Sequence, residues 1–369
     1  MNTVTSLQIR EVEVLFRPFF NRKLNLRNRI VMAPLRRNYA PDGIPTAEML
    51  QYYRRRAECE VGLIITEAAA VGDPVAAEDN CMPRFYGGAP LRAWKQICRA
   101  VHATHCSMAP LLCHVGMARP LHGDIPNPDL LPIGPSGINP HTLELTGEEM
   151  SRNRIRDVLQ AFSSAAAAAV KLGFDAVAIE GAGGYLIEQF LRADTNQRRD
   201  IYGGDIAARA RFACEAVHAV RRAVGRNFPI LFRYSPVYAG FQEKRLAETP
   251  HELATLLELL SDSGVDIFDC VSPHHAQPAF PGSSLTPAAW TRLLTGKPVI
   301  SGGAVGLNMQ GGSLPLSLSG VLRMVSAGEI DLVSVGRALL ADPAWAEKLH
   351  LARESEMIPF TPRVIGRLL

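Results

Sequence analysis

The stretch SSAAAAAVKLGFDAVAIEGA, residues 163–182, decides the fold. Its first half is rich in alanine, the strongest helix former, and Gly173 ends the helical pattern. A short apolar run follows from Asp175 to Ile179, as expected for a strand that is covered on both faces. The run stops at a charged residue, Glu180. A helix that leads directly into a buried strand is the repeating unit of an α/β fold with a parallel sheet.

The same unit recurs along almost the whole chain. Short runs rich in apolar and β-branched residues alternate with helical patterns, and the strands are expected at 29–34, 61–69, 108–115, 175–182, 229–236, 266–273, 297–304 and 331–338. Eight such units predict an α/β fold of the closed (β/α)8 TIM-barrel type. An open doubly wound sheet is the alternative, but no predicted strand is followed by the GxGxxG turn that is typical of dinucleotide-binding sheets.

Two helices have clear ends in the sequence. The first is expected over 147–172, because Thr146 and Glu149 have the spacing of a capping box. The second is expected over 206–225, where apolar residues recur at helical spacing before a glycine.

Two segments fall outside the repeating unit. Residues 12–28 precede the first strand and are interpreted as a β-hairpin that plugs the barrel floor. The proline-rich segment 116–147 is too long for an ordinary loop, so we interpret it as a lid or rim insertion after strand three. No second domain is indicated, and residues 1–369 are expected to form a single domain.

Composition argues against several classes of protein. Of 369 residues, 47% are hydrophobic and 20% are charged, which is typical of a globular chain with a large core. The net charge is only +3, so neither nucleic acid nor a membrane surface is an expected partner. No segment is apolar for long enough to span a membrane, and the N-terminus lacks a secretory pattern. Seven scattered cysteines without a CxxC pair predict free thiols, no metal site and a cytoplasmic location.

In a TIM barrel the functional side chains come from the C-terminal ends of the strands. The seventh predicted strand ends in Gly302 and Gly303, and the eighth ends in Gly336 and Arg337. Glycines let backbone N–H groups approach an anion, and an arginine can bind the same anion bidentately. These adjacent turns predict a phosphate site, although tight turns and a surface charge are the structural alternative. Arg233 ends an otherwise apolar strand, so it needs a barrel carboxylate or an electron-rich ligand ring as its partner.

The segments that carry these residues resemble the old yellow enzyme family of FMN-dependent oxidoreductases. The strongest match is GYLIEQFLRADTNQRRDIYGGDIAARARF, residues 184–212. Further segments are similar to the family in the family's order: LFRPFF, LNLRNRIVMAPL, YYRRRAE, GLIITEAAAV, CHVG, RYSP, ISGGA and VGRALLADP. The resemblance covers residues 14–350. It implies one FMN-binding barrel that uses NADPH or NADH and acts on a small-molecule substrate, and family members are often homo-oligomers.

The resemblance also implies a place for FMN over the barrel mouth. The phosphate would lie on the two glycine turns and the arginine described above. Arg233 would contact the N1 and O2 edge of the ring and stabilise charge that develops there. Ala33, Pro34 and Leu35 would run along one face of the ring, with Ala68 at its pyrimidine or N5 side.

The family's usual oxidising substrate is an α,β-unsaturated carbonyl compound. Hydride passes from the nicotinamide to FMN and then to the β-carbon of the substrate. A tyrosine at the position of Tyr185 protonates the α-carbon from the opposite face, because a phenol can donate to a developing enolate. The structural alternative for Tyr185 is an aromatic rim residue that packs on the lid.

Four positions depart from the family's pattern. The family has a His-x-x-His or His-x-x-Asn pair that donates to the substrate carbonyl, and Glu180 and Gly183 stand in its place. An ionised glutamate accepts hydrogen bonds and cannot donate them. Arg36 replaces a Thr or Cys near the flavin C4 carbonyl, and Leu111 replaces a Gln at the pyrimidine edge. His114 is kept, and we expect it to bind substrate together with Arg36 and Glu180.

Glu180 has three functional interpretations. It pairs with Arg36 across the barrel mouth, it binds a cationic or amine substrate, or it acts as a general acid or base whose pKa is raised by apolar surroundings. A salt bridge without a role in the chemistry is the structural alternative.

The expected function is hydride transfer from NAD(P)H through FMN to an activated alkene of a specialised substrate. Tyr185 and Glu180 are the expected catalytic residues, and Arg36 would replace the missing donors. Two alternatives stay open. One is a flavoprotein amine dehydrogenase, desaturase or redox-neutral isomerase. The other is a barrel that has lost its flavin redox function through Leu111 and Arg36.

Overall fold

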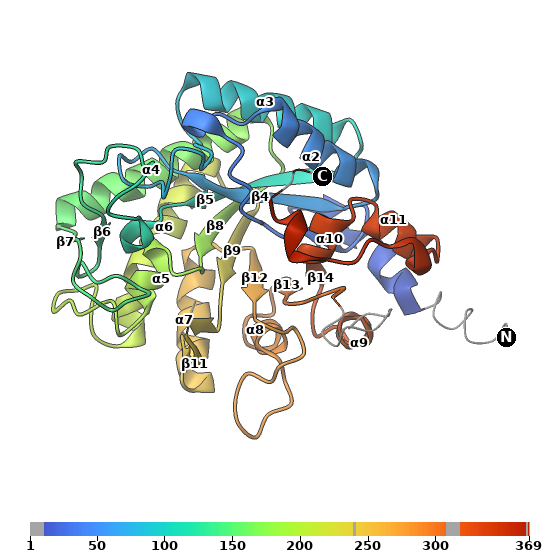
Figure 1. The fold of residues 1–369 in the computed structure, drawn as a ribbon. Coiled ribbons are helices and arrows are strands. Elements are labelled where there is room, and N and C mark those ends of the chain that lie inside the picture. The colour runs from blue at the N-terminus through green and yellow to red at the C-terminus, as the bar shows by residue number, and fades with distance from the viewer. Residues whose placement is uncertain (1–10, 239–240, 308–317, 367, 369) are drawn as a thin grey trace.

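Eight parallel strands close into a barrel in the computed structural model (Figure 1). The structure describes residues 11–238, 241–307, 318–366 and 368. Each strand pairs with the next one along the chain, and the eighth pairs with the first. In chain order they are β3 (Ile30–Met32), β4 (Leu63–Ala70), β5 (Ser107–Cys113), β8 (Val177–Gly181), β9 (Ile230–Tyr234), β12 (Ile267–Val271), β13 (Val299–Gly302) and β14 (Leu332–Val335). The barrel confirms the predicted fold, since each predicted strand range overlaps one of these strands.

Helices surround this barrel on its outer side (Figure 1). They are α2 (Ala47–Glu58), α3 (Gly88–His102), α4 (Arg152–Leu172), α5 (Leu186–Leu191), α6 (Ile206–Val224), α7 (Pro250–Ser263), α8 (Pro287–Thr295), α9 (Ser319–Ser326), α10 (Arg337–Ala341) and α11 (Trp345–His350). Short 3-10 turns are η1 (Pro41–Gly43), η2 (Gly116–Ala118), η3 (Glu354–Glu356) and η4 (Pro362–Val364).

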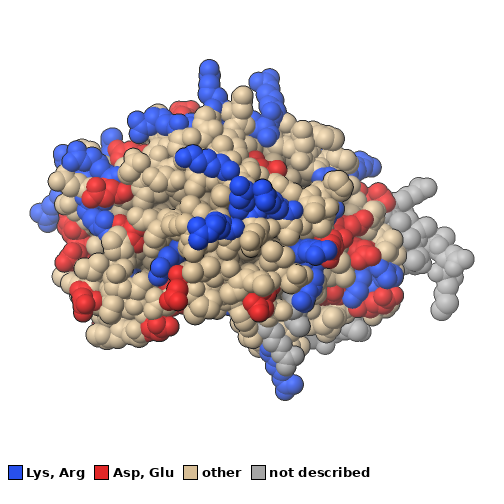
Figure 2. Space-filling model, turned by 90° about the horizontal axis from the view of Figure 1, so that it is seen from above, with Lys and Arg blue, Asp and Glu red and all other residues tan. Residues whose placement is uncertain are grey.

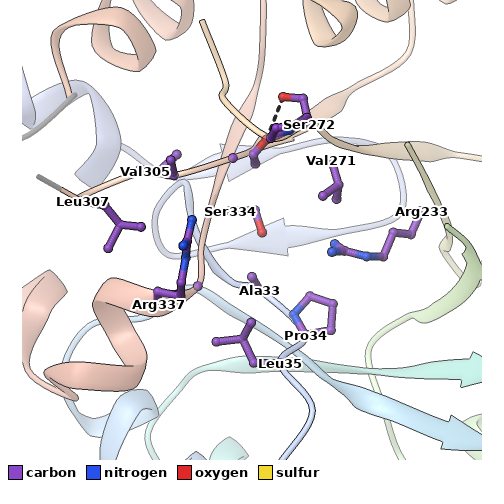
Figure 3. A pocket seen from close by; sticks show the side chains of 15 residues that line it. Ala33, Pro34, Leu35, Arg233, Val271, Ser272, Val305, Leu307, Ser334 and Arg337 are labelled. Carbon is purple, nitrogen blue, oxygen red and sulfur yellow. Dashed lines mark hydrogen bonds between the residues drawn. The ribbon is translucent and has the colours of Figure 1, made fainter. Parts of the chain in front are cut away.

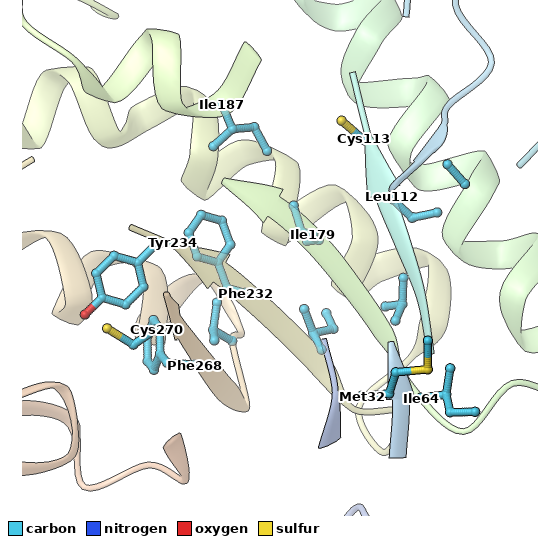
Figure 4. Packing of buried hydrophobic residues seen from close by; sticks show 14 of the residues in the cluster. Met32, Ile64, Leu112, Cys113, Ile179, Ile187, Phe232, Tyr234, Phe268 and Cys270 are labelled. Atoms are coloured by element: carbon cyan, nitrogen blue, oxygen red, sulfur yellow. The ribbon is translucent and has the colours of Figure 1, made fainter. Parts of the chain in front are cut away.

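The core has two layers because successive side chains of a strand point to opposite faces. Those on the outer face pack under the helices, including Met32, Ile64, Leu112, Ile179, Phe232 and Phe268 (Figure 4). Those on the inner face fill the barrel, including Val31, Leu63, Ile65, Leu231, Ile267, Ile300 and Leu332. The two layers explain why the strands read as continuous apolar runs in the sequence.

A short hairpin lies at the N-terminal end of the barrel. Its strands β1 (Phe19–Phe20) and β2 (Asn25–Leu26) pair antiparallel. Phe19, Leu24 and Leu26 belong to the cluster that fills the barrel interior. Lys23 pairs at 2.7 Å with Asp266, the residue directly before β12. The hairpin therefore covers the barrel at the end opposite to the C-terminal ends of the strands.

The segment 116–147 lies beside α5 (Figure 1). Its β6 (Ile133–Gly134) pairs parallel with β7 (Glu148–Glu149). The Met117 N–H donates to Oε1 of Gln189 in α5 at 3.0 Å. These contacts tie the segment to the region after β8, and its role as a lid stays a prediction.

The start of α4 differs from the sequence prediction. The predicted capping box at Thr146 and Glu149 is wrong, because Ser151 is the N-cap and its hydroxyl accepts from the Arg154 N–H at 3.1 Å. Thr146 N–H instead donates to Gly137 at 3.0 Å, and Glu149 lies in β7. Pairing with the preceding segment keeps these residues extended. A local capping signal cannot reveal such pairing.

Among the helices that the structure describes, none is long and apolar enough to cross a membrane.

Candidate functional site

Two cavities lie at the C-terminal ends of the barrel strands, and both are lined in part by Pro34. The first cavity has a volume of about 220 Å³ (Figure 3). Its lining comprises Ala33, Pro34, Leu35, Arg233, Val271, Ser272, Pro273, Gly302, Gly303, Ala304, Val305, Leu307, Ser334, Gly336 and Arg337. The structure thus brings together eight of the predicted cofactor residues from four strand ends: Ala33, Pro34, Leu35, Arg233, Gly302, Gly303, Gly336 and Arg337.

The glycine turn after β13 has a backbone that other residues rarely adopt. Gly303 has φ +139°, and a Cβ atom added to it would lie 2.4 Å from the Ser272 carbonyl oxygen. On the neighbouring turn, a Cβ added to Gly336 would lie 3.5 Å from the Cβ of Ala33. Arg337 extends into the cavity beside Val305 and Leu307 (Figure 3). Two glycine turns and one guanidinium therefore line the same space, which is the composition expected of a phosphate site.

Arg233 stands between two buried carboxyl groups. Its Nη1 donates to Asp269 Oδ2 at 2.6 Å, and its Nε lies 3.6 Å from Glu180 Oε2. The register of the sheet brings these three side chains together. Arg233 on β9 is paired with Glu180 on β8 and with Asp269 on β12. Burial lowers the pKa of Arg233, but the two carboxylates outweigh it and raise the pKa above its usual value. The expected barrel carboxylate is thus found. Asp269 was not predicted from the sequence.

The second cavity is smaller, at about 130 Å³. It is lined by Pro34, Arg36, Asn38, Glu67, Ala68, Glu78, Met82, Leu111, Glu180 and Tyr185. The remaining predicted residues, except His114, therefore meet here. Three of the lining side chains are carboxyl groups.

Glu180 is buried and does not pair with Arg36. Its side chain is 7% exposed, and its Oε1 accepts from the Ala182 N–H at 2.9 Å. Burial raises the pKa of Glu180 from 4.5 to about 6, although Arg233 and the Ala182 N–H lower it. The proposed ion pair with Arg36 is wrong, because Arg233 on the neighbouring strand is the cation beside Glu180.

Arg36 is instead held by the loop after β4. Its Nη1 lies 2.9 Å from Glu78, and its Nη2 donates to Asp79. Its Nε donates to Asn38 Oδ1 at 2.7 Å. The side chain is 49% exposed. All three guanidinium nitrogens thus have protein acceptors, which weakens the prediction that Arg36 replaces the missing substrate donors.

Tyr185 lines the second cavity at the start of α5, where it is the N-cap residue. Burial raises the pKa of the Tyr185 phenol well above its usual value, so the phenol keeps its proton. Gly183 lies close by with φ +73°, and a Cβ added there would lie 3.2 Å from the Tyr185 ring. The protonated phenol thus belongs to a residue that lines the second cavity, and its role as a proton donor stays a prediction.

His114 lines neither cavity. Its side chain is fully buried, with Nε2 3.2 Å from Asp73 Oδ1 and Nδ1 accepting from the Gly116 N–H at 3.0 Å. Arg154 pairs with the same carboxylate at 2.6 Å. The predicted contact of His114 with substrate is not supported by this placement, because these protein partners occupy both ring nitrogens.

Glu67 is a site residue to which the sequence analysis gave no role. Its Oε2 accepts from the N–H groups of Arg37 at 2.9 Å and Asn38 at 3.3 Å. Its buried Oε1 has no hydrogen-bond partner among the described residues. Burial raises the pKa of Glu67 from 4.5 to about 7, although the hydrogen bonds from these two N–H groups lower it. The signal was visible, since Glu67 interrupts the apolar run of β4, as Glu180 interrupts that of β8.

The variant Glu67→Gln tests this protonation. Folding favours the protonated form of Glu67. This proton therefore stabilises the folded protein fully below pH 4.5, and the stabilisation is lost as the pH rises through about 7. Glutamine retains an acceptor for the two N–H groups and cannot ionise. We expect the variant to be more stable than the parent at about pH 8, by on the order of 3 kcal/mol, and not at about pH 4.

Urea unfolding at both pH values measures this difference. Glu58→Gln is the control, because Glu58 is exposed and pairs with Arg54 in the same helix. An equal change in stability at both pH values would contradict a protonated Glu67.

FMN fits the residues of the first cavity. Its phosphate matches the two glycine turns and Arg337, and Pro34 and Leu35 offer an apolar wall for a ring. The Ser334 Oγ is buried without a hydrogen-bond partner among the described residues, and it lies between Arg233 and Arg337 (Figure 3). Such an atom is satisfied when a ligand hydroxyl or carbonyl lies beside it. At the second cavity, Leu111 offers no hydrogen bond to a ring edge.

No group of metal-ligating side chains that could hold an ion occurs in the described part of the chain.

Comparisons with known proteins identify the family of this chain. The model of the NADH:flavin oxidoreductase / NADH oxidase family matches residues 14–356. An NADH oxidase of Thermoanaerobacter brockii is 31% identical over 345 residues, 90% of this chain and 50% of that protein. An NADPH dehydrogenase of Bacillus subtilis is 31% identical over 337 residues, 90% of this chain and 93% of that protein. The chain thus spans about half the length of the first relative and nearly all of the second.

Solved structures of morphinone reductase have the same fold. One has a TM-score of 0.80 at 26% identity, with 95% of this chain and 92% of that chain covered. A mutant in complex with tetrahydroNAD has a TM-score of 0.82 at 26% identity, with 95% and 93% covered. From the family match over most of its length, the chain belongs to the NADH:flavin oxidoreductase / NADH oxidase family, which is the old yellow enzyme family of FMN-dependent oxidoreductases.

Proposed function

We propose that the protein is an FMN-dependent oxidoreductase that transfers hydride from NAD(P)H to an activated alkene of a specialised substrate. The observation that carries the proposal is the contact of the two cavities at Pro34. The first cavity has the features of a phosphate and ring site, and the second places Tyr185 beside it. The NADPH dehydrogenase among the relatives and the tetrahydroNAD complex of morphinone reductase support a nicotinamide as the electron donor.

FMN would supply the hydride chemistry, and the protein residues supply orientation, charge and a proton. Arg233 presents a buried positive charge to the first cavity, where it stabilises negative charge that develops on a bound ring. Tyr185 remains protonated and donates its proton to the carbon next to the substrate carbonyl.

The carbonyl donors that the family usually provides are absent at Glu180 and Gly183. Glu180 can donate only when it is protonated, which applies below about pH 6. A substrate whose alkene is already activated by its own substituents therefore suits this cavity better than a simple enone. The same holds for a substrate whose carbonyl is held by other protein groups. This argument is the basis for a specialised substrate.

A visible absorption spectrum of the purified protein tests the proposal. We expect a flavin band that NADPH or NADH bleaches without oxygen and that an α,β-unsaturated carbonyl compound restores. A bound flavin that neither nicotinamide bleaches would contradict the proposal. A flavin that bleaches but is never reoxidised by alkenes would remove the alkene part only.

The variant Glu180→Gln tests the role of the carboxyl group in alkene reduction. The parent should reoxidise its reduced flavin faster as pH falls through about 6, because protonation of Glu180 creates a donor. Glutamine donates at every pH, so the variant should be faster at about pH 8, by roughly tenfold or more, and independent of pH in this range. Stopped-flow reoxidation with a cyclic enone measures both profiles. Identical profiles in parent and variant would contradict this role.

Oxidation of an amine is the second candidate function. Three carboxyl groups line the second cavity: Glu67, Glu78 and Glu180. Glu180 is ionised above about pH 6 and then favours a positively charged substrate, whereas Glu67 ionises only near pH 7 and Glu78 pairs with Arg36. Burial raises the pKa of Glu78 as well, although Arg36 and a hydrogen bond from Tyr185 lower it. The same Glu180→Gln variant separates the two functions, since it should weaken binding of an ammonium compound and speed reduction of an enone.

A further inference from the structure

We propose that His275 and Ser272, in the loop after β12, hold the turn after β13 in the form that binds the phosphate of FMN. Both would be positioning residues, because they act through the backbone of Gly302 and Gly303. The proposal goes beyond the proposed function, since it concerns the affinity for the cofactor and is independent of the substrate.

The carbonyl oxygens of Gly302 and Gly303 both accept hydrogen bonds from this loop. The Gly303 oxygen accepts from the His275 N–H at 3.1 Å and from His275 Nδ1 at 2.8 Å. The Gly302 oxygen accepts from the Ser272 N–H at 3.2 Å, and the single Ser272 hydroxyl hydrogen is shared between the Gly302 oxygen at 3.3 Å and the His274 oxygen at 3.0 Å. Each carbonyl thus has a backbone donor, and only the Gly303 oxygen has a side-chain donor of its own. His275 is only 2% exposed, so its hydrogen bond is shielded from water.

The orientation of these carbonyls sets the direction of the next amides. In a trans peptide the C=O and the following N–H point in opposite directions. Because the Gly302 and Gly303 oxygens are held by this loop, the peptide planes of the turn that lines the first cavity are fixed in one orientation. Arg337 lines the same cavity on the side opposite Ser272 (Figure 3). The two residues therefore help to fix the turn that, together with Arg337, lines the space for one anion.

The turn needs this support because its backbone conformation is unusual. Gly303 has φ +139°, and Ala304, a residue with a side chain, has φ +51°. Non-glycine residues seldom adopt such angles without help from their surroundings. Two side-chain hydrogen bonds across the loop supply that help.

His275 is itself fixed on its other sides. Its ring stacks on His274, with ring centroids 4.6 Å apart. A Cβ added to Gly320 in α9 would lie 3.2 Å from His275 Nε2, so the helix passes close to the ring. Burial lowers the pKa of His275, which favours the neutral ring, and that ring still donates through Nδ1. The imidazole therefore connects the loop, the turn and α9.

Titration of the flavin-free protein with FMN and with riboflavin tests the proposal. Riboflavin has the same ring and lacks the phosphate. His275→Ala should weaken FMN binding by roughly tenfold and leave riboflavin binding unchanged, because only the phosphate site is disturbed. His275→Asn should restore most of the affinity, since the asparagine amide nitrogen lies where Nδ1 lies. Ser272→Ala should have a smaller effect of the same kind.

The variant His218→Ala is the control, because His218 is exposed on α6 and lines neither cavity, and its affinity for both flavins should match that of the parent. Equal weakening of FMN and riboflavin by His275→Ala would overturn the proposal, as would unchanged affinity for FMN or a failure of asparagine to restore it. If His275→Ala does not fold, Ser272→Ala and His275→Asn decide the outcome. A failure of the proposed alkene reduction would change none of these titrations, because they contain no substrate.

Discussion

Tyr185→Phe is expected to lower the rate of alkene reduction by about a hundredfold or more. The variant keeps the aromatic ring at the start of α5 and removes only the hydroxyl that faces the second cavity. Reduction of the flavin by NADPH needs no proton from this phenol, so its rate should stay near that of the parent. Stopped-flow measurement of the two half-reactions separates these effects.

Tyr202→Phe is a matched control for this prediction. Tyr202 also donates to a glutamate, Glu215 at 2.9 Å, but it lines neither cavity. Its removal should leave both half-reactions unchanged. An equal loss in the two half-reactions of Tyr185→Phe would show a packing role for the ring environment and contradict proton donation.

Arg233→Met is expected to destabilise the fold by about 3–5 kcal/mol at neutral pH. The variant leaves Asp269 and Glu180 buried without the cation between them. Both carboxyl groups should then take up protons, so the loss should shrink as the pH is lowered. FMN affinity should fall as well, because Arg233 lines the first cavity. Urea unfolding across a pH series measures the stability.

Two further variants make the stability result specific. Arg54→Met removes an exposed ion pair with Glu58 in α2 and should cost less than about 1 kcal/mol. Adding Asp269→Asn to Arg233→Met should recover part of the lost stability, because one buried charge is removed. If Arg233→Met and Arg54→Met were equally stable, the buried triad would not contribute as we infer.

The barrel could be predicted from the sequence because each strand carries its own signal. A strand that is covered on both faces is apolar where it is buried in the core. This holds for most of β5 and for the first three residues of β8 and β9, before Glu180 and Arg233. The start of α4 shows the limit of local signals. Thr146 and Glu149 have the spacing of a cap, but pairing with residues 132–137 makes that segment extended.

The candidate site also combines features that local sequence signals predict with contacts that only the folded chain shows. The glycine turns and Tyr185 could be placed at the barrel mouth because strand ends in a barrel meet there. The partners of the charged residues could not be predicted. Arg36 and Glu180 are both near the second cavity, but the loop after β4 brings Glu78 and Asp79 to Arg36. Sheet register brings Arg233 to Glu180.

The sequence by itself determined the closed barrel, the family and the residues that gather at its mouth, since periodicity and motifs are properties of local stretches. Only the tertiary structure decided which charges pair, that His114 is enclosed by Asp73 and Gly116, and that His275 holds the Gly303 carbonyl. The physical reason is the separation along the chain over which each effect acts. Hydrophobic periodicity acts over one helix or strand, whereas an ion pair or a buried hydrogen bond depends on distances between segments that are far apart in the chain.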